Sequence, residues 1–153
     1  VMADKAELML DILDDLEVIT GTQTYFLAGK WIEDARSWGT TEEEKDFYER
    51  EARNIITTWA GKAHQSLNDY ARRTCNGLIS SYYKPRWERF FKAVADRMDE
   101  GKGFHMEQYL VYKDQITDFE MQWWQECIGE FISSPEGDSK QTVKEVILKS
   151  SER

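Results

Sequence analysis

Apolar side chains recur every three or four residues along most of this chain, and this spacing strongly constrains the fold. An α-helix turns once in 3.6 residues, so the repeat places these side chains on one helical face, whereas a strand needs every second residue apolar. We find no segment with the two-residue period. The sequence therefore predicts an all-α fold, a bundle of six or seven helices.

The first three helices are bounded by recognisable start and stop signals. Apolar repeats predict one helix at about 3–19 and a second within 26–38. Thr40-Thr41 stand three residues before Glu43-Glu44, the spacing of a capping box, so a third helix should begin there. Ala60-Gly61 should end it. Its apolar stripe is expected to contain Phe47 or Tyr48, Glu51 or Ala52, Ile55 and Trp59, with Trp59 in the last turn.

Further helices are expected in the second half. Asn68 or Asp69 caps a fourth helix that runs to about Tyr82, and Pro85 fits the first turn of a fifth. A long sixth helix follows from about Phe104 to 133–137, and a short last helix begins at Asp138 or Ser139, with 150–153 frayed. The aromatic residues on these helical stripes should pack in the core; they are Trp31, Trp87, Phe119 and Trp123.

Length and charge limit the classes of function. The chain has 153 residues, 41% of them hydrophobic, enough to bury the core of a single domain. No apolar run reaches membrane-spanning length, and a net charge of -9 disfavours nucleic acids and anionic membranes, so neither partner is expected. The chain begins with Val rather than Met, so we expect a mature or excised piece of a longer protein.

Motifs for catalysis or metal binding are missing from the sequence. His64 and His105 lie in no metal-ligand spacing, so we expect solvent-facing histidines, no metal site and no cofactor. Cys75 and Cys127 have no metal-type spacing either, and we expect two buried, reduced thiols. Carboxylates are abundant, but abundance selects no catalytic pair. The sequence therefore assigns no catalytic residue.

Aromatic and polar residues at helix ends suggest a ligand site. Trp59 and Tyr70 flank one short loop, where a ring can stay accessible while its backbone is held rigidly. These rings either contact a ligand or close over the end of the bundle. Asp69 either caps a helix or accepts hydrogen bonds from a ligand hydroxyl. The usual role of Arg53 and Arg86 would be to pair with carboxylates of the same domain.

Several segments, taken in order, give the sequence a family resemblance. They are Trp31-Ile32-Glu33-Asp34-Ala35-Arg36-Ser37, Ala52-Arg53-Asn54 with Ile56-Thr57 and Trp59, Asp69-Tyr70-Ala71, Gly77-Leu78 and Tyr82-Tyr83-Lys84-Pro85-Arg86-Trp87. With them the chain resembles the C-terminal α-helical domain of family 89 glycoside hydrolases, the α-N-acetylglucosaminidases. The likeness covers almost the whole chain and weakens after about Glu100.

The resemblance implies a function shared with a larger enzyme. It implies that residues 1–153 form a single helical domain at the C-terminal part of a multidomain glycosidase. The parent would remove terminal α-linked N-acetylglucosamine from glycans with retention, using two glutamates of a barrel domain that this chain lacks. The isolated chain should therefore be inactive. By the same resemblance the parent would be secreted, periplasmic or lysosomal.

Within that enzyme the chain would form one wall of the active-site pocket. The resemblance implies that Trp59 and Tyr70 contact the sugar, while Asn68 and Asp69 shape the loop between them. The alternative is an independent helical protein-interaction module, because Trp, Tyr and Arg also dominate protein interfaces. A docking domain should show a large apolar face bordered by Trp59 and Tyr70, whereas an interaction module should show an aromatic patch without a concave, polar-rimmed pocket.

Overall fold

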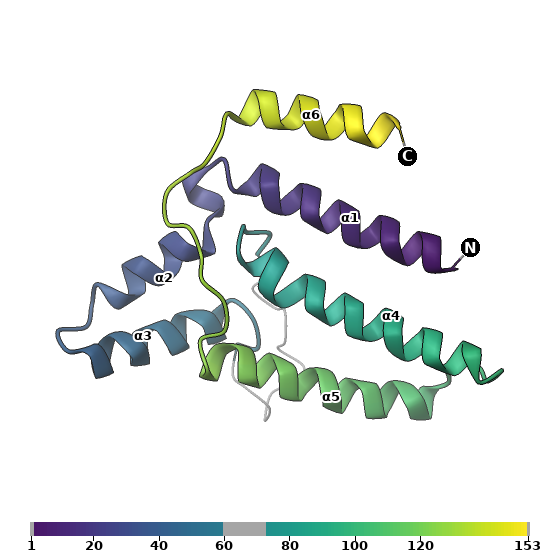
Figure 1. Ribbon diagram of the computed structural model, residues 1–153. Helices are drawn as coiled ribbons and strands as arrows, with labels where there is room; N and C mark the ends of the chain where they lie inside the picture. Colours follow the sequence, from purple (N-terminus) through teal and green to yellow (C-terminus); the bar gives the residue numbers. More distant parts are fainter. Residues whose placement is uncertain (1, 60–72, 153) are drawn as a thin grey trace.

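The computed structural model describes residues 2–59 and 73–152, and these residues form helices joined by turns (Figure 1). The elements are α1 (Met2–Thr20), the short helix η1 (Thr24–Phe26), α2 (Ala28–Arg36), α3 (Glu42–Ile55), the π-helical turn η3 (Ile79–Tyr83), α4 (Lys84–Asp99), α5 (Met106–Gln125) and α6 (Ser139–Ser151). The predicted all-α fold is confirmed. Within the described residues, no helix combines the length and apolar character needed to cross a bilayer.

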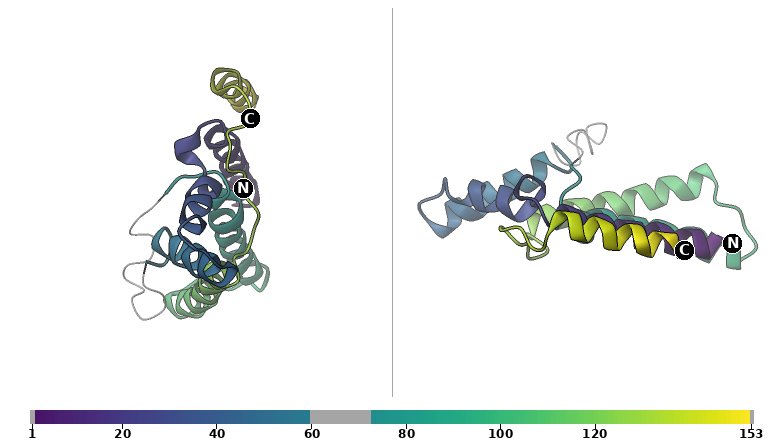
Figure 2. Two further views of the ribbon diagram at one scale, coloured as in Figure 1. Left: turned by 90° about the vertical axis from the view of Figure 1, so that its left-hand side faces the viewer. Right: turned by 90° about the horizontal axis from the view of Figure 1, so that it is seen from above.

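Four of the helices lie side by side in a row. Helices α6, α1, α4 and α5 follow one another in that order, and neighbours run in opposite directions (Figures 1 and 2). Helices α2 and α3 form a hairpin beside one end of this row (Figure 1). The segment between α5 and α6 returns along that end, so it lies against both the hairpin and the row.

The core forms where the hairpin meets the row. Its buried residues are Ala28, Ile56, Leu78, Tyr82 and Trp123, which come from α2, the turn after α3, the residue before η3, η3 itself and α5. The Tyr82 ring lies 5.1 Å from the Trp123 ring, and the Trp123 indole N–H donates to Ser81 Oγ at 3.0 Å. Burial of these large rings stabilises this junction, and the Trp123 indole N–H keeps a hydrogen-bond partner there.

Two predicted helix starts that rest on capping residues, those of α3 and α6, are confirmed. The Thr41 hydroxyl accepts a hydrogen bond from Glu44 N, and the Glu44 carboxylate accepts one from Thr41 N, which completes a capping box at the start of α3. Asp138 accepts from Gln141 N and caps α6. The frayed end predicted for 150–153 is wrong in part, since α6 continues through Ser151.

The predicted end of α3 is wrong, and its predicted inward stripe is wrong except at Ala52. The helix ends at Ile55, so Trp59 lies beyond it rather than in its last turn. Its buried face carries Glu49, Ala52 and Arg53, whereas Phe47, Tyr48 and Ile55 are exposed. A buried ion pair occupies the inward face, and an apolar pattern cannot identify charged residues as buried ones.

The separate fourth helix is also wrong over the residues that the structure describes. Residues 73–77 are not helical, and Asn76 pairs with Leu27 in an isolated β-bridge. Helical structure begins at Leu78 and continues through η3 into α4, with Pro85 in the first turn of α4. A residue of α1 caps the start of this helical stretch, because the Glu17 carboxylate accepts hydrogen bonds from Gly77 N at 2.6 Å and from Ser80 N at 3.1 Å.

Two of the four aromatic residues predicted for the core lie there. Trp123 is fully buried and Phe119 packs against the core. The other two predictions are wrong, since Trp31 is 46% exposed and Trp87 is 38% exposed. In α2 the Trp31 ring lies across α3 and donates its indole N–H to Ala52 O at 3.0 Å. In the described part of the chain, too few elements pack against α2 and α4 to bury every ring on their apolar faces.

Candidate functional site

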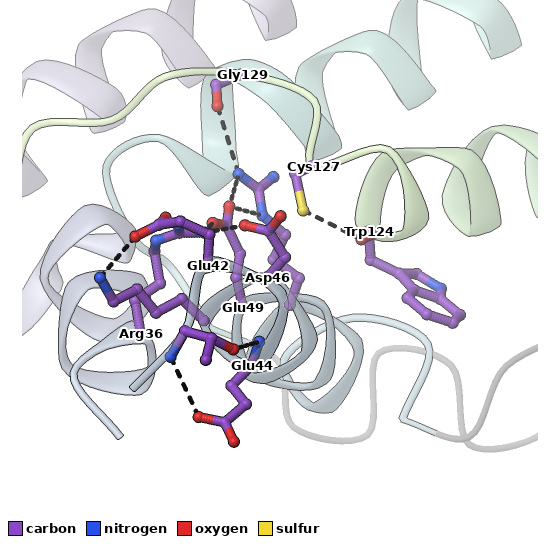
Figure 3. Close-up of polar contacts among 11 residues, drawn as sticks. Arg36, Glu42, Glu44, Asp46, Glu49, Trp124, Cys127 and Gly129 are labelled. Atoms are coloured by element: carbon purple, nitrogen blue, oxygen red, sulfur yellow. Dashed lines mark hydrogen bonds and ion pairs between the residues drawn. The ribbon is translucent and has the colours of Figure 1, made fainter. Parts of the chain in front are cut away.

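The α2–α3 hairpin is held together by ion pairs that converge on Arg36. This guanidinium donates to Asp46 at 2.7 Å and Glu49 at 2.8 Å, and it also bonds to Glu42 at 3.1 Å. Figure 3 shows these three carboxylates gathered on one side of α3, facing Arg36. The hydrogen bonds to Asp46 and then Glu49 raise the pKa of Arg36 above its ordinary value, so its charge is fixed.

Arg53 continues this network into the interior. Its side chain is 2% exposed, and its Nε donates to Glu49 Oε1 at 2.9 Å. Nη1 donates to Ile128 O at 2.8 Å and Nη2 to Gly129 O at 3.4 Å. Figure 3 shows the segment of Cys127 and Gly129 passing beside the hairpin, directly after α5. Arg53 therefore anchors the C-terminal half of α3 to the chain that follows α5.

Two aromatic rings complete the surroundings of Arg53. Its guanidinium carbon lies 4.8 Å from the Trp123 ring centre and 5.0 Å from that of Phe131. A planar guanidinium can stack on such rings while its fork of N–H groups binds oxygen atoms. Lysine could not reproduce both contacts. The last turns of α3 are consequently held by a charged, hydrogen-bonded and packed centre.

Directly after this centre, a tight turn presents Trp59. Thr57 and Thr58 are buried, and their hydroxyls donate to Arg53 O at 2.7 Å and to Asn54 Oδ1 at 2.5 Å. Trp59 N donates to Asn54 O at 2.7 Å, with Trp59 in a left-handed conformation of φ 63°. Its side chain is nevertheless 41% exposed. The turn fixes the Trp59 backbone while much of the ring faces outward.

Only part of the predicted site falls within the described residues. Trp59 has the predicted combination of a held backbone and an exposed ring, although the predicted ligand contact remains a prediction. Asn68, Asp69 and Tyr70 lie outside the described residues, as does His64. His105 is exposed in the turn before α5, as predicted.

The predicted partners of both arginines are confirmed. Arg53 pairs with Glu49, and Arg86 pairs with Glu120 at 3.0 Å, with the Glu120 side chain 2% exposed. Sequence reasoning missed Asn54, Thr57 and Thr58 as the residues that build the turn. One signal was available, because Asn54 and Thr58 stand four residues apart at the end of a helix, where side chains can bond to each other.

A separate hollow of about 580 Å³ lies between α1, α4 and α5. Aromatic rings dominate its walls, and they belong to Tyr83, Trp87, Phe90, Tyr109 and Tyr112. The Tyr112 hydroxyl donates to Arg86 O at 3.0 Å, and burial raises the pKa of Tyr112 to about 12. The hydroxyl therefore stays protonated at physiological pH and acts as a hydrogen-bond donor.

Thiol chemistry and metal binding have little support among the described residues. Cys75 and Cys127 are free thiols, as expected, but each is only partly buried. Burial raises the pKa of both thiols, which disfavours the reactive thiolate. No group of three or more potential metal ligands occurs in the part of the chain that the structure describes.

Comparisons with known proteins agree on one family. Residues 1–149 match the family described as the alpha-N-acetylglucosaminidase (NAGLU) C-terminal domain. The alpha-N-acetylglucosaminidase of Homo sapiens is 31% identical over 142 residues, which are 93% of this chain and 18% of that protein. The present chain thus spans less than a fifth of the length of this relative.

Solved structures with the same fold come from Clostridium perfringens. A family 89 glycoside hydrolase in complex with PUGNAc has a TM-score of 0.76 over 93% of this chain and 16% of its own. The complex with 2-acetamido-1,2-dideoxynojirmycin has a TM-score of 0.78 over 95% of this chain and 16% of its own. Both are 24% identical to this chain, so these matches establish its fold.

Proposed function

Because this chain belongs to the family of alpha-N-acetylglucosaminidase C-terminal domains, we propose that it is the helical C-terminal part of a larger retaining α-N-acetylglucosaminidase. The observation that carries the proposal is the family match across residues 1–149. The substrate class is a glycan that ends in α-linked N-acetylglucosamine. The name of the human relative supports this choice, as does a related bacterial enzyme in complex with its substrate GlcNAc-alpha-1,4-galactose.

The chain's role is to position the sugar rather than to break its bond. Retaining hydrolysis needs two carboxyl groups roughly 5 Å apart on either side of the glycosidic bond. The buried carboxylates of Glu49 and Glu120 are both committed to ion pairs with arginines of this chain. We therefore assign the acid/base and the nucleophile to a barrel domain of the parent enzyme.

Trp59 is the residue through which this wall contacts the sugar. An indole face packs well against the C–H groups of a pyranose, and a rigid support makes that contact specific. The exposed ring on a fixed backbone supports this role. We propose that Tyr70 is the second contact, with Asn68 and Asp69 shaping the loop that connects the two rings.

The α2–α3 hairpin is the surface on which the barrel domain docks. Its large apolar side chains are unusually exposed: Trp38 at 76%, Phe47 at 52%, Trp31 at 46%, Ile55 at 42% and Tyr48 at 37%. Apolar patches of this kind mark interaction sites. The docking partner proposed here is part of the same polypeptide, because the relatives of this chain are several times longer than the chain itself. Trp59, four residues after the end of α3, would then lie near this contact.

The same exposed aromatic side chains also favour a second candidate, an independent module that binds another protein. Activity measurements separate the two candidates. The gene's full-length product should hydrolyse an aryl α-N-acetylglucosaminide, and the present chain alone should not. An inactive full-length product would favour the interaction module. Turnover by this chain alone that is lost with one Glu replacement would refute the accessory role.

A second measurement tests the contact made by Trp59. In the full-length enzyme, Trp59→Ala should lower kcat/KM about a hundredfold, because a positioning contact is lost. The thermal transition should move little, since the ring is 41% exposed. Tyr25→Ala, which removes a 95% exposed ring outside the α2–α3 hairpin, serves as the control for loss of a surface ring. Equal losses of activity and stability at Trp59 would mean that its ring only packs.

A further inference from the structure

We propose that Asn54 and Thr58 are positioning residues that hold the Trp59 ring in the orientation needed for the carbohydrate. This inference rests on the proposed function, because it assumes that the ring contacts sugar. It goes further by naming the residues that set the ring's direction. Neither residue contacts the ligand in this proposal, and both act through the backbone of Trp59.

The geometry of the turn supports the inference. Asn54 O accepts hydrogen bonds from Thr57 N at 3.1 Å and Trp59 N at 2.7 Å, so one carbonyl gathers two amides of the turn. The Thr58 hydroxyl donates to Asn54 Oδ1 at 2.5 Å, which ties the side chain of the same residue to the turn. Thr58 is 1% exposed, so this bond is shielded from water.

The backbone of Trp59 shows what these bonds must overcome. A φ of 63° is unfavourable for a residue with a β-carbon, and glycine usually occupies such positions. Trp59 occupies the position instead, in a chain where Gly61 stands only two residues later. Strain of this kind persists only where the surrounding contacts enforce it, and it clusters at functional sites.

The same contacts determine where the ring points. A left-handed residue directs its side chain away from the path that a continuing helix would give it. If the turn relaxed to ordinary helical angles, the indole would move to another part of the surface. Loss of the bond from Thr58 to Asn54 should therefore displace the ring without removing it.

The experiment uses the full-length enzyme and an aryl α-N-acetylglucosaminide. Thr58→Val removes the hydroxyl and keeps the shape, and it should lower kcat/KM about tenfold through a misplaced ring. Thr58→Ser keeps the hydroxyl and should restore kcat/KM to within about twofold of the wild type. The matched control is Thr117→Val, which removes another buried hydroxyl, bonded to Lys113 O at 2.9 Å in α5.

A double-mutant cycle shows whether Thr58 acts through the ring. In the Trp59→Ala background, Thr58→Val should change kcat/KM less than about twofold, because no ring remains to be displaced. A full tenfold loss in that background would overturn the proposal, and so would equal losses in the Thr58→Val and Thr117→Val enzymes. If Trp59→Ala itself leaves kcat/KM unchanged, the proposed sugar contact fails instead.

Discussion

The left-handed backbone conformation of Trp59 costs the chain conformational energy, although it places the ring where the proposed function needs it. A residue with a β-carbon loses about 1–2 kcal/mol in this conformation, whereas glycine adopts it freely. The Trp59 side chain is 41% exposed, so only part of its surface contributes packing energy. The backbone conformation alone would therefore favour glycine at this position.

Substitutions in the isolated chain can measure this conflict. Trp59→Gly should unfold with a free energy about 0.5–1 kcal/mol higher than that of Trp59→Ala, because both lose the ring but only alanine keeps the strain. Urea denaturation gives both values. At Glu51, an exposed position inside α3, the order should reverse, with Glu51→Gly less stable than Glu51→Ala. A Trp59→Gly chain less stable than Trp59→Ala would show that the turn is unstrained.

Sequence reasoning could predict the exposure of Trp59 but not its conformation. Its place beside a loop, next to Ala60-Gly61, indicated an accessible ring on a held backbone. Left-handed residues are predicted from glycine or asparagine, and here the conformation falls on a tryptophan. It depends on the bond between Asn54 and Thr58, which no propensity scale includes.

Among the elements, α3 combines a predictable start with an unpredictable inward face. Its capping box depends on short-range contacts, so the spacing of Thr41 and Glu44 was sufficient to place it. Its buried face depends on Arg53 and Glu49, whose burial requires carbonyls from 128–129 and rings from distant elements. A pattern that assigns charged residues to solvent therefore missed the burial of Glu49 and Arg53 on α3.

The capping box makes the stability of α3 sensitive to acid. Hydrogen bonds from the Thr40 hydroxyl, then from the Thr40 and Thr41 amides, lower the pKa of Glu44 below its ordinary value of 4.5. A depressed carboxyl pKa stabilises the fold above the unfolded-state value, and the contribution is lost as pH falls through the folded-state value. Wild-type chain should therefore melt above Glu44→Gln near neutral pH, and the difference should shrink below pH 4.5.

Melting curves recorded across this pH range by circular dichroism would test the prediction. Glu43→Gln removes a carboxylate from the neighbouring exposed position and controls for charge at the helix N-terminus. Thr41→Ala should cost about 1 kcal/mol at all these pH values, because it removes the other half of the box. A difference between wild type and Glu44→Gln that stays constant down to pH 3 would contradict the assignment.

At the scale of the whole molecule, α6 lies at one edge of the row of helices, against α1, and is less deeply buried than α5 (Figure 1). Among the described residues of α6, only Thr142 is buried, whereas α5 buries Ile116, Thr117, Glu120 and Trp123. Helix α6 is tied to α1 by the ion pair of Lys149 with Asp15 at 2.7 Å. Sequence periodicity could predict both helices but not their pairing, because an apolar stripe does not specify its partner.

Hydrogen exchange should show this uneven stability. We expect α6 amides to exchange through local opening, faster than those around Trp123 in α5. Lys149→Met should speed exchange in α6 and leave α5 unchanged, while Lys144→Met, at an exposed position of the same helix, should leave both unchanged. Mass spectrometry of peptides from each helix resolves the two rates. Equal protection of α6 and α5 would show that the row opens as one unit.

The pairing of α1 with α6 also constrains how the chain matures during translation. Asp15 is made 134 residues before Lys149, its partner in the ion pair. Until Lys149 leaves the ribosome, the side of α1 that faces α6 in the folded chain cannot form its native contacts with that helix. Nascent chains stalled before α6 should therefore bind chaperones more strongly than the complete chain does.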